Sequence, residues 1–225
     1  MKRLLILVLL SVGMANAQTV EFIGQAYDLD SGRLLYREIH QLTLTDGQPT
    51  RETIQFLDPD DQPLAHKIIT YIEPARPAFE MYIPAEQRQD SVLPMADGVH
   101  VSGRENGVVA WPKQAAIIDA GFHYFVLQHF DELKAGHRLD VEFLIASRLR
   151  WVALTLEPTS IDEQQMVVQL TVQNAVLRWL IDPIELTYDM PRRRLLEYRG
   201  LIRVPGEDGG NYQARIRYQY EAIPS

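Results

Sequence analysis

Residues 213–220 read QARIRYQY, and this stretch decides the fold. Apolar and polar side chains alternate in it without a break, which is the period-2 pattern of a half-buried strand. Side chains of an extended chain point alternately to its two faces, so one face is apolar and the other polar. The apolar face would carry Ala214, Ile216, Tyr218 and Tyr220, and the polar face Gln213, Arg215, Arg217 and Gln219.

The same alternation returns along most of the chain. Between these runs lie turn sequences such as Asp30-Ser31-Gly32, Asp46-Gly47 and Glu105-Asn106-Gly107, in which Gly and Asn accept positive φ and Asp caps its own backbone. Runs at this spacing predict an antiparallel meander that curls toward a barrel. The expected strands before the last are Val20–Tyr27, Arg33–Leu44, Thr50–Leu57, Ala65–Ile72, Ala78–Ile83, Leu139–Ile145, Arg150–Leu156, Met166–Val172, Ala175–Leu180, Ile184–Tyr188 and Arg194–Arg199.

One segment, Asp119–Ala135, has a helical period instead. It predicts one amphipathic helix of about four turns on the sheet or at its end, with Asp119 as N-cap and Gly136 as the left-handed residue after it. The side chains expected to face inward are Phe122, Phe125, Val126, Phe130 and Leu133. Those expected to face water or the flank of the helix are His123, Gln128, Asp131, Glu132 and Lys134.

These patterns predict a mainly β protein: one antiparallel, strongly curved or barrel-like sheet with one principal amphipathic helix. No low-complexity linker divides the chain, so residues 18–225 are expected to form a single domain. An outer-membrane barrel is the rival architecture. The amphipathic helix and the tail Glu221–Ser225, which continues past the last strand, disfavour it.

The first seventeen residues, MKRLLILVLLSVGMANA, have the three parts of a secretory signal peptide. Lys2 and Arg3 form the positive region, Leu4 to Val12 is an apolar run, and Ala15-Asn16-Ala17 supplies the small residues before a cleavage point. The run is too short for a bilayer span, which needs about 20 residues, and no later segment could anchor a helix in a membrane. We therefore expect a periplasmic protein that is exported through a cleavable signal.

Composition excludes several classes of function. The chain has no cysteine, so it has no disulfide, thiolate metal site, cysteine nucleophile or lipidated cysteine. With 22 Lys+Arg against 30 Asp+Glu, it lacks the basic balance of a nucleic-acid binder. The sequence leaves the oligomeric state open.

Catalytic and cofactor motifs are missing from the sequence. It contains no GxSxG, HExxH, P-loop or GxGxxG pattern. The Asp-rich turns Asp28–Gly32 and Asp58–Asp61 resemble the start of a calcium loop. The first has Gly32 at its fifth position, where the pattern needs an oxygen ligand, and the second has Pro63 at its sixth, where the pattern needs glycine. We interpret both as hairpin turns. We therefore predict no catalytic residue, no cofactor and no metal site.

Aromatic and basic side chains offer a candidate ligand-binding set. The dipeptide Arg-Trp occurs on two expected strands, and Arg beside Trp suits cation–π contact or an anionic ligand with an apolar part. If the helix closes the sheet, its aromatic face would line a cavity. The candidate ligand contacts are Phe122, Phe125, His129, Arg150, Trp151, Arg178 and Trp179.

Two hairpin sequences resemble each other. Tyr27-Asp28, four residues and Arg33-Leu34-Leu35 are matched by Tyr188-Asp189, four residues and Arg194-Leu195-Leu196. Convergent turn chemistry and a duplicated half are both compatible with this match.

The second half of the chain also resembles a known group of proteins. The motifs are Gly121-Phe122-His123-Tyr124-Phe125-Val126, Val141 to Arg148, Asp182-Pro183-Ile184 and Tyr198-Arg199-Gly200-Leu201. Over roughly Asp119 to Tyr220 they are similar to a group of uncharacterised exported bacterial β-rich proteins. The resemblance implies a secreted β-rich domain of unknown function and brings no catalytic residue with it. A looser architectural analogy extends to lipocalin-like barrels and periplasmic lipoprotein carriers, which hold acyl chains inside a curved sheet.

Two functions follow as hypotheses. The first is a non-enzymatic envelope protein that binds an apolar or amphipathic small ligand in the hollow of the sheet, or an envelope protein partner. The second is a hydrolase of a cell-envelope polymer that uses carboxylates brought together by the fold. A large apolar cavity would favour the first, and two buried carboxyl groups about 5–10 Å apart in an open cleft the second.

Overall fold

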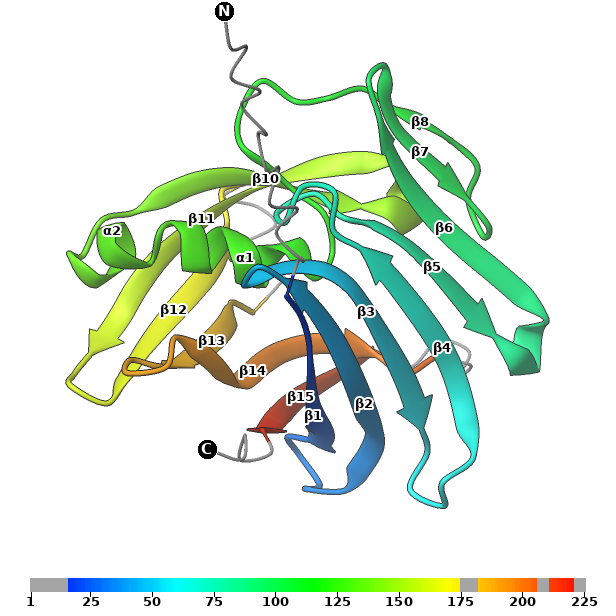
Figure 1. The fold of residues 1–225 in the computed structure, drawn as a ribbon, viewed down its shortest axis with the longest axis horizontal. Coiled ribbons are helices and arrows are strands. Elements are labelled where there is room, and N and C mark those ends of the chain that lie inside the picture. Colours follow the sequence, from blue (N-terminus) through cyan, green and yellow to red (C-terminus); the bar gives the residue numbers. More distant parts are fainter. Residues whose placement is uncertain (1–15, 175–181, 206–210, 221–225) are drawn as a thin grey trace, which may run out of the picture.

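The computed structural model describes residues 16–174, 182–205 and 211–220, and in these residues the chain forms one sheet of 15 strands. The sheet curves strongly around a hollow, as Figure 1 shows. Its strand order is β8-β7-β6-β5-β4-β3-β2-β1-β15-β14-β13-β12-β11-β10-β9. The strands are β1 (Ala17–Asp28), β2 (Leu34–Thr45), β3 (Gln48–Leu57), β4 (Pro63–Thr70), β5 (Ala78–Ile83), β6 (Arg88–Met95), β7 (Gly98–Ser102), β8 (Gly107–Val109), β9 (Ala116–Ile117), β10 (Leu139–Ile145), β11 (Arg150–Ile161), β12 (Gln165–Val172), β13 (Ile184–Asp189), β14 (Arg194–Arg203) and β15 (Asn211–Tyr220).

The first and last strands meet in the middle of the sheet. β1 pairs antiparallel with β15, and Phe22 lies opposite Tyr220. The alternation that predicted β15 is confirmed, because Ala214 and Ile216 are buried while Arg217 is exposed. The two halves of the chain therefore form a continuous wall around the hollow.

The mainly β prediction is confirmed, with one correction. The sheet is not wholly antiparallel, since β9 runs parallel to β10. The sequence left open whether the sheet closes; it stays open, with β8 and β9 as its two edges. Strands β6 to β9 were not expected from the sequence. The expected strand Ala175–Leu180 lies outside the described residues, as do residues 1–15 of the expected signal peptide and the tail 221–225.

The expected single helix is two helices. α1 (Gly121–Gln128) and α2 (Phe130–Lys134) meet at His129, whose φ of −108° and ψ of 20° depart from helical values. In Figure 1 both helices lie within the hollow of the sheet. The expected left-handed residue after them, Gly136, has a φ of +87° and donates its N–H to the carbonyl of Leu133.

The start of α1 is fixed differently from the prediction. Asp119 does not cap the helix: the N-cap is Ala120, which makes no side-chain capping bond, and the carboxylate of Asp119 bonds Lys67 instead. Gly121 sits against the carbonyl oxygen of Ala75, where a Cβ atom would come within 2.1 Å of that oxygen. Only glycine permits such a close approach. The contact between Gly121 and Ala75 therefore anchors α1 to the loop before β5.

The hydrophobic core occupies three regions. The first is covered by the helices, where buried Phe125, Val126, Phe130 and Leu133 pack against β10 to β14. The second lies around β1 to β4 and β15, and the third lies near the edge strands β7 to β9. The predicted inward face of the helical segment is thus confirmed for these four residues, and Phe122 is partly buried against the first region.

The two hairpins that share a sequence pattern also share an irregularity. β1 and β2 shift register at Ala26/Tyr27, and β13 and β14 shift at Thr187/Tyr188. Both shifts fall at the tyrosine of the shared pattern, where a β-bulge sharpens the local twist. In the part of the chain that the structure describes, no helix has both the length and the hydropathy to cross a bilayer.

Candidate functional site

A cavity of about 830 Å³ lies between α1 and the concave face of the sheet. Its lining is mostly apolar and comes from both halves of the chain, including β1 to β4, β13 to β15 and α1. Ligand pockets in proteins typically measure about 300–1,000 Å³, so the cavity is large enough for a small molecule. Protein interiors are otherwise close-packed, and unfilled volume costs stability.

The mouth of this cavity is marked by lining residues that are exposed to solvent. They come from the start of β1, the β2–β3 turn, the end of α1, the β13–β14 turn and β14. Apart from Leu201 they are polar, charged or glycine: Gln18, Gly47, Gln48, Gln128, Arg192 and Arg193. The mouth is therefore largely polar while the interior is mostly apolar, which suits an amphipathic ligand.

A buried polar network forms part of the cavity wall. His40 on β2 lies between two carboxylates: its Nδ1 is 2.7 Å from Glu52 Oε1, and its Nε2 is 3.0 Å from Glu38 Oε2. Tyr71 donates its hydroxyl hydrogen to Glu52 Oε2 at 2.5 Å. All four residues are buried, with no more than 7% of each exposed. Buried charges require such pairing, so the network holds β2, β3 and the end of β4 in place.

Opposing effects set the protonation of the network. Burial would lower the pKa of His40, but the hydrogen bonds and charges of Glu38 and Glu52 outweigh it and raise the pKa to about 9. Burial would raise the pKa of Glu52, but the hydrogen bond and charge of His40 and the bond from Tyr71 lower it overall. At neutral pH His40 is therefore an imidazolium that donates both N–H groups, and Glu52 is a carboxylate.

An aromatic ladder continues from this network across four strands. The ring of Phe22 stacks on His40 with centroids 4.2 Å apart, and on its other side it stacks on Tyr220 at 4.9 Å. The guanidinium of Arg194 lies 5.0 Å from the centre of the Tyr220 ring. Tyr220 is fixed by donating its hydroxyl hydrogen to the carbonyl of Leu195 at 2.9 Å. The ladder joins β2, β1, β15 and β14 along the cavity wall.

His123 lines the same cavity, which corrects the expectation that it faces water or the helix flank. Its ring stacks on Tyr188 at 5.7 Å, and its Nδ1 is 3.3 Å from the Tyr188 hydroxyl. Burial lowers the pKa of His123 to about 4, against the opposing charge of Glu52. It is therefore neutral at physiological pH.

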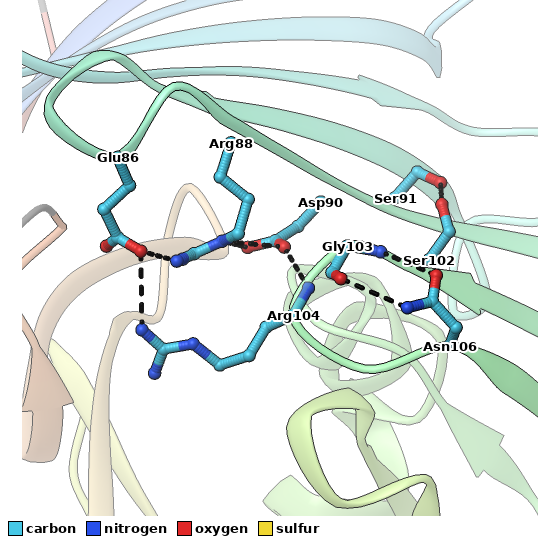
Figure 2. Close-up of polar contacts among 8 residues, drawn as sticks. All are labelled: Glu86, Arg88, Asp90, Ser91, Ser102, Gly103, Arg104 and Asn106. Atoms are coloured by element: carbon cyan, nitrogen blue, oxygen red, sulfur yellow. Dashed lines mark hydrogen bonds and ion pairs between the residues drawn. The ribbon is translucent and has the colours of Figure 1, made fainter.

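A second cavity, of about 620 Å³, lies on the β5–β7 side of the molecule and has a charged wall. Figure 2 shows this wall, where the guanidinium of Arg88 lies between the carboxylates of Glu86 and Asp90. The backbone N–H of Arg104 bonds Asp90 at 2.9 Å, and its guanidinium is 3.5 Å from Glu86. A Cβ at Gly103 would lie 2.1 Å from Asp90 Oδ1, so glycine lets the loop wrap this carboxylate. The charges of the wall largely neutralise one another.

The two cavities share part of their lining. Lys67, Asp119 and Phe143 border both of them. The ammonium of Lys67 bonds the carboxylate of Asp119 and lies 4.5 Å from the centre of the Phe79 ring. This ion pair therefore stands at the boundary between the mostly apolar cavity and the charged one.

The candidate ligand contacts from the sequence fall in different places. Phe122 lines the first cavity, whereas Phe125 is buried in the core and His129 pairs with Glu132 at 2.8 Å. Arg150 is exposed, and Trp151 packs near Trp111 and donates its indole N–H to the carbonyl of Ala110. Arg178 and Trp179 lie outside the described residues.

Sequence reasoning missed the polar network and the ladder. One signal was available: Glu38 and His40 are two apart on an expected strand and share a face with Tyr36, which is buried. Charged side chains on an otherwise apolar face indicate a buried polar site. In the described residues, no group of three His, Asp or Glu side chains is arranged to hold a metal ion.

No protein-family model matches the sequence, and no curated protein is significantly similar to it. A similar solved structure is the crystal structure of a β-barrel-like protein of domain of unknown function DUF1849 from Brucella abortus. The match has a TM-score of 0.54 at 9% sequence identity and covers 90% of this chain and 95% of that one. This chain therefore shares the fold of a β-barrel-like protein of unknown function.

Proposed function

We propose that this protein is exported to the periplasm and binds an apolar or amphipathic molecule in the first cavity without changing it chemically. The observation that carries the proposal is the mostly apolar cavity of about 830 Å³ with a largely polar mouth. A pocket with apolar walls and a few fixed polar groups is the usual form of a small-molecule site. The signal peptide expected at residues 1–17 supports the periplasmic location.

The alternative, a carboxylate-dependent hydrolase, is less well supported, although the fold does bring Glu38 and Glu52 close together. In a glycosidase one carboxyl group must keep its proton, which requires a raised pKa. The pKa of Glu52 is lowered, and His40 stands between the two carboxylates where a substrate would have to enter. Glu38 and Glu52 are therefore better suited to stabilising the cavity wall than to acid–base catalysis.

Binding of a neutral apolar dye, N-phenylnaphthylamine, tests this proposal. We expect saturable fluorescence enhancement with the wild-type protein. Leu127→Trp, on the cavity side of α1, should weaken dye binding about tenfold or more because the indole fills the cavity. The matched control is Leu93→Trp, at a side chain on β6 that is 45% exposed and does not line this cavity; it should bind as the wild type does.

Circular dichroism would verify that both variants are folded. An absence of saturable dye binding by the wild type, or equal binding by all three proteins, would exclude the cavity as the binding site.

A further inference from the structure

Three consecutive arginines lie at the mouth of the first cavity, and they differ in their partners. Arg192 contacts the carboxylate of Asp189 at 3.5 Å, and Arg193 bonds that of Asp131 at 2.8 Å. Arg194 has no carboxylate partner among the described residues and lies instead over the ring of Tyr220. Within the described part of the chain, its positive charge is therefore not neutralised by a carboxylate.

Arg194 is also placed deeper than its neighbours. It is half-buried, whereas Arg192 and Arg193 are exposed. The Tyr220 ring beneath it is held by its own hydrogen bond to Leu195. A guanidinium in partly desolvated surroundings forms stronger charge-assisted hydrogen bonds with an anion than one in open water.

The charges of the cavity lining determine whether the head or the chain of a bound amphiphile lies at the mouth. The buried network in the same wall holds two carboxylates, Glu38 and Glu52, against the single imidazolium of His40. This excess of negative charge disfavours an anionic group beside the network. Arg194 is the half-buried cation of the cavity lining that lacks a described carboxylate partner, so an anionic head would be placed there and the chain against the apolar lining.

We propose that Arg194 binds the anionic head group of an amphiphile whose apolar chain occupies the first cavity. This inference rests on the proposed binding function and adds the class of ligand. The head is a carboxylate or a phosphate ester, since a guanidinium presents paired N–H groups to either.

Displacement of bound N-phenylnaphthylamine tests the inference, because the dye is neutral and does not itself need Arg194. The competitors are dodecanoate, dodecyl phosphate, dodecanol and dodecylammonium, which share one chain and differ in the head. The variants are Arg194→Gln, Arg194→Lys and Arg217→Gln. Arg217 is exposed, does not line the cavity and pairs with Glu197, so it serves as the matched control.

For the two anions we expect Arg194→Gln to lower affinity about tenfold, Arg194→Lys to lower it less, and Arg217→Gln to leave it unchanged. Affinity for dodecanol and dodecylammonium should not fall in any variant. An equal change for all four competitors, no change for the anions, or no displacement of the dye by either anion would overturn the role of Arg194. Failure of the dye itself to bind the wild type would instead reject the proposed function.

Discussion

Replacing His40 with leucine is expected to lower the free energy of unfolding by about 3–5 kcal/mol, because it leaves Glu38 and Glu52 buried without a counter-charge. His40 is 6% exposed and bonds both carboxylates, so neither can reach water without disrupting the wall. The triple variant Glu38→Gln, His40→Leu, Glu52→Gln removes the charges together and should recover most of the loss. Urea unfolding of the three proteins at neutral pH measures these differences. A loss below about 1 kcal/mol for His40→Leu would show that the carboxylates are not held by it.

The same substitution should remove a characteristic pH dependence. The pKa of His40 is raised from 6.5 to about 9 in the folded protein, so its contribution to stability is complete below pH 6.5 and is lost as pH rises through 9. The wild type should therefore lose on the order of a few kcal/mol between these limits, and His40→Leu should lose little. His123 has the opposite pH dependence. Its pKa is lowered to about 4, so its contribution to stability is complete above pH 6.5 and falls as the pH is lowered.

Phe130→Ala should lower the free energy of unfolding by about 3–5 kcal/mol, because it opens a cavity beneath α2. The Phe130 side chain is 1% exposed, and its ring makes a T-shaped contact with Tyr188, with the ring centroids 6.1 Å apart. The guanidinium of Arg193 lies 4.8 Å from the centre of the Phe130 ring.

The matched control for Phe130→Ala is Lys134→Ala on the exposed side of α2, which should change stability by no more than about 0.5 kcal/mol. Equal shifts in the urea midpoints of the two variants would contradict the placement of α2 against the sheet.

Local patterns predicted the regular strands well. The bounds of β5 agree with the sequence expectation, and the two faces of β15 were assigned correctly from alternation alone. β6 was missed because its first four residues, Arg88 to Ser91, are all polar and show no alternation. Its pairing with β5 and β7 depends on contacts between strands, which a local pattern does not contain.

The helical segment shows a different limit of local reasoning. Apolar spacing across residues 122–133 fits one continuous helix, and nothing in it marks the break at His129. The assignment of Asp119 as N-cap followed from its residue type, but Lys67 on β4 competes successfully for its carboxylate. Such long-range competition is settled by the tertiary fold and not by helix propensity.

Predicting the candidate site would have required the strand register as well as the sequence. Glu38 and His40 share a face by their spacing alone, but Glu52 joins them only because β2 pairs with β3 with His40 opposite Ile54. Arg194 and Phe22 are 172 residues apart in sequence, yet they belong to one ladder because the first and last strands are neighbours. The curvature of the sheet around this central pair creates a cavity that no single segment of the chain encodes.

Mass spectrometry of organic extracts from the natively purified protein would test whether this cavity carries an anionic amphiphile in the cell. Wild type and Leu127→Trp would be released from cells by osmotic shock, purified without detergent and extracted in parallel. We expect an amphiphile with a carboxylate or phosphate head in nearly equimolar amount from the wild type, and far less from Leu127→Trp. Extracts without any amphiphile, or with equal amounts from both proteins, would contradict this expectation.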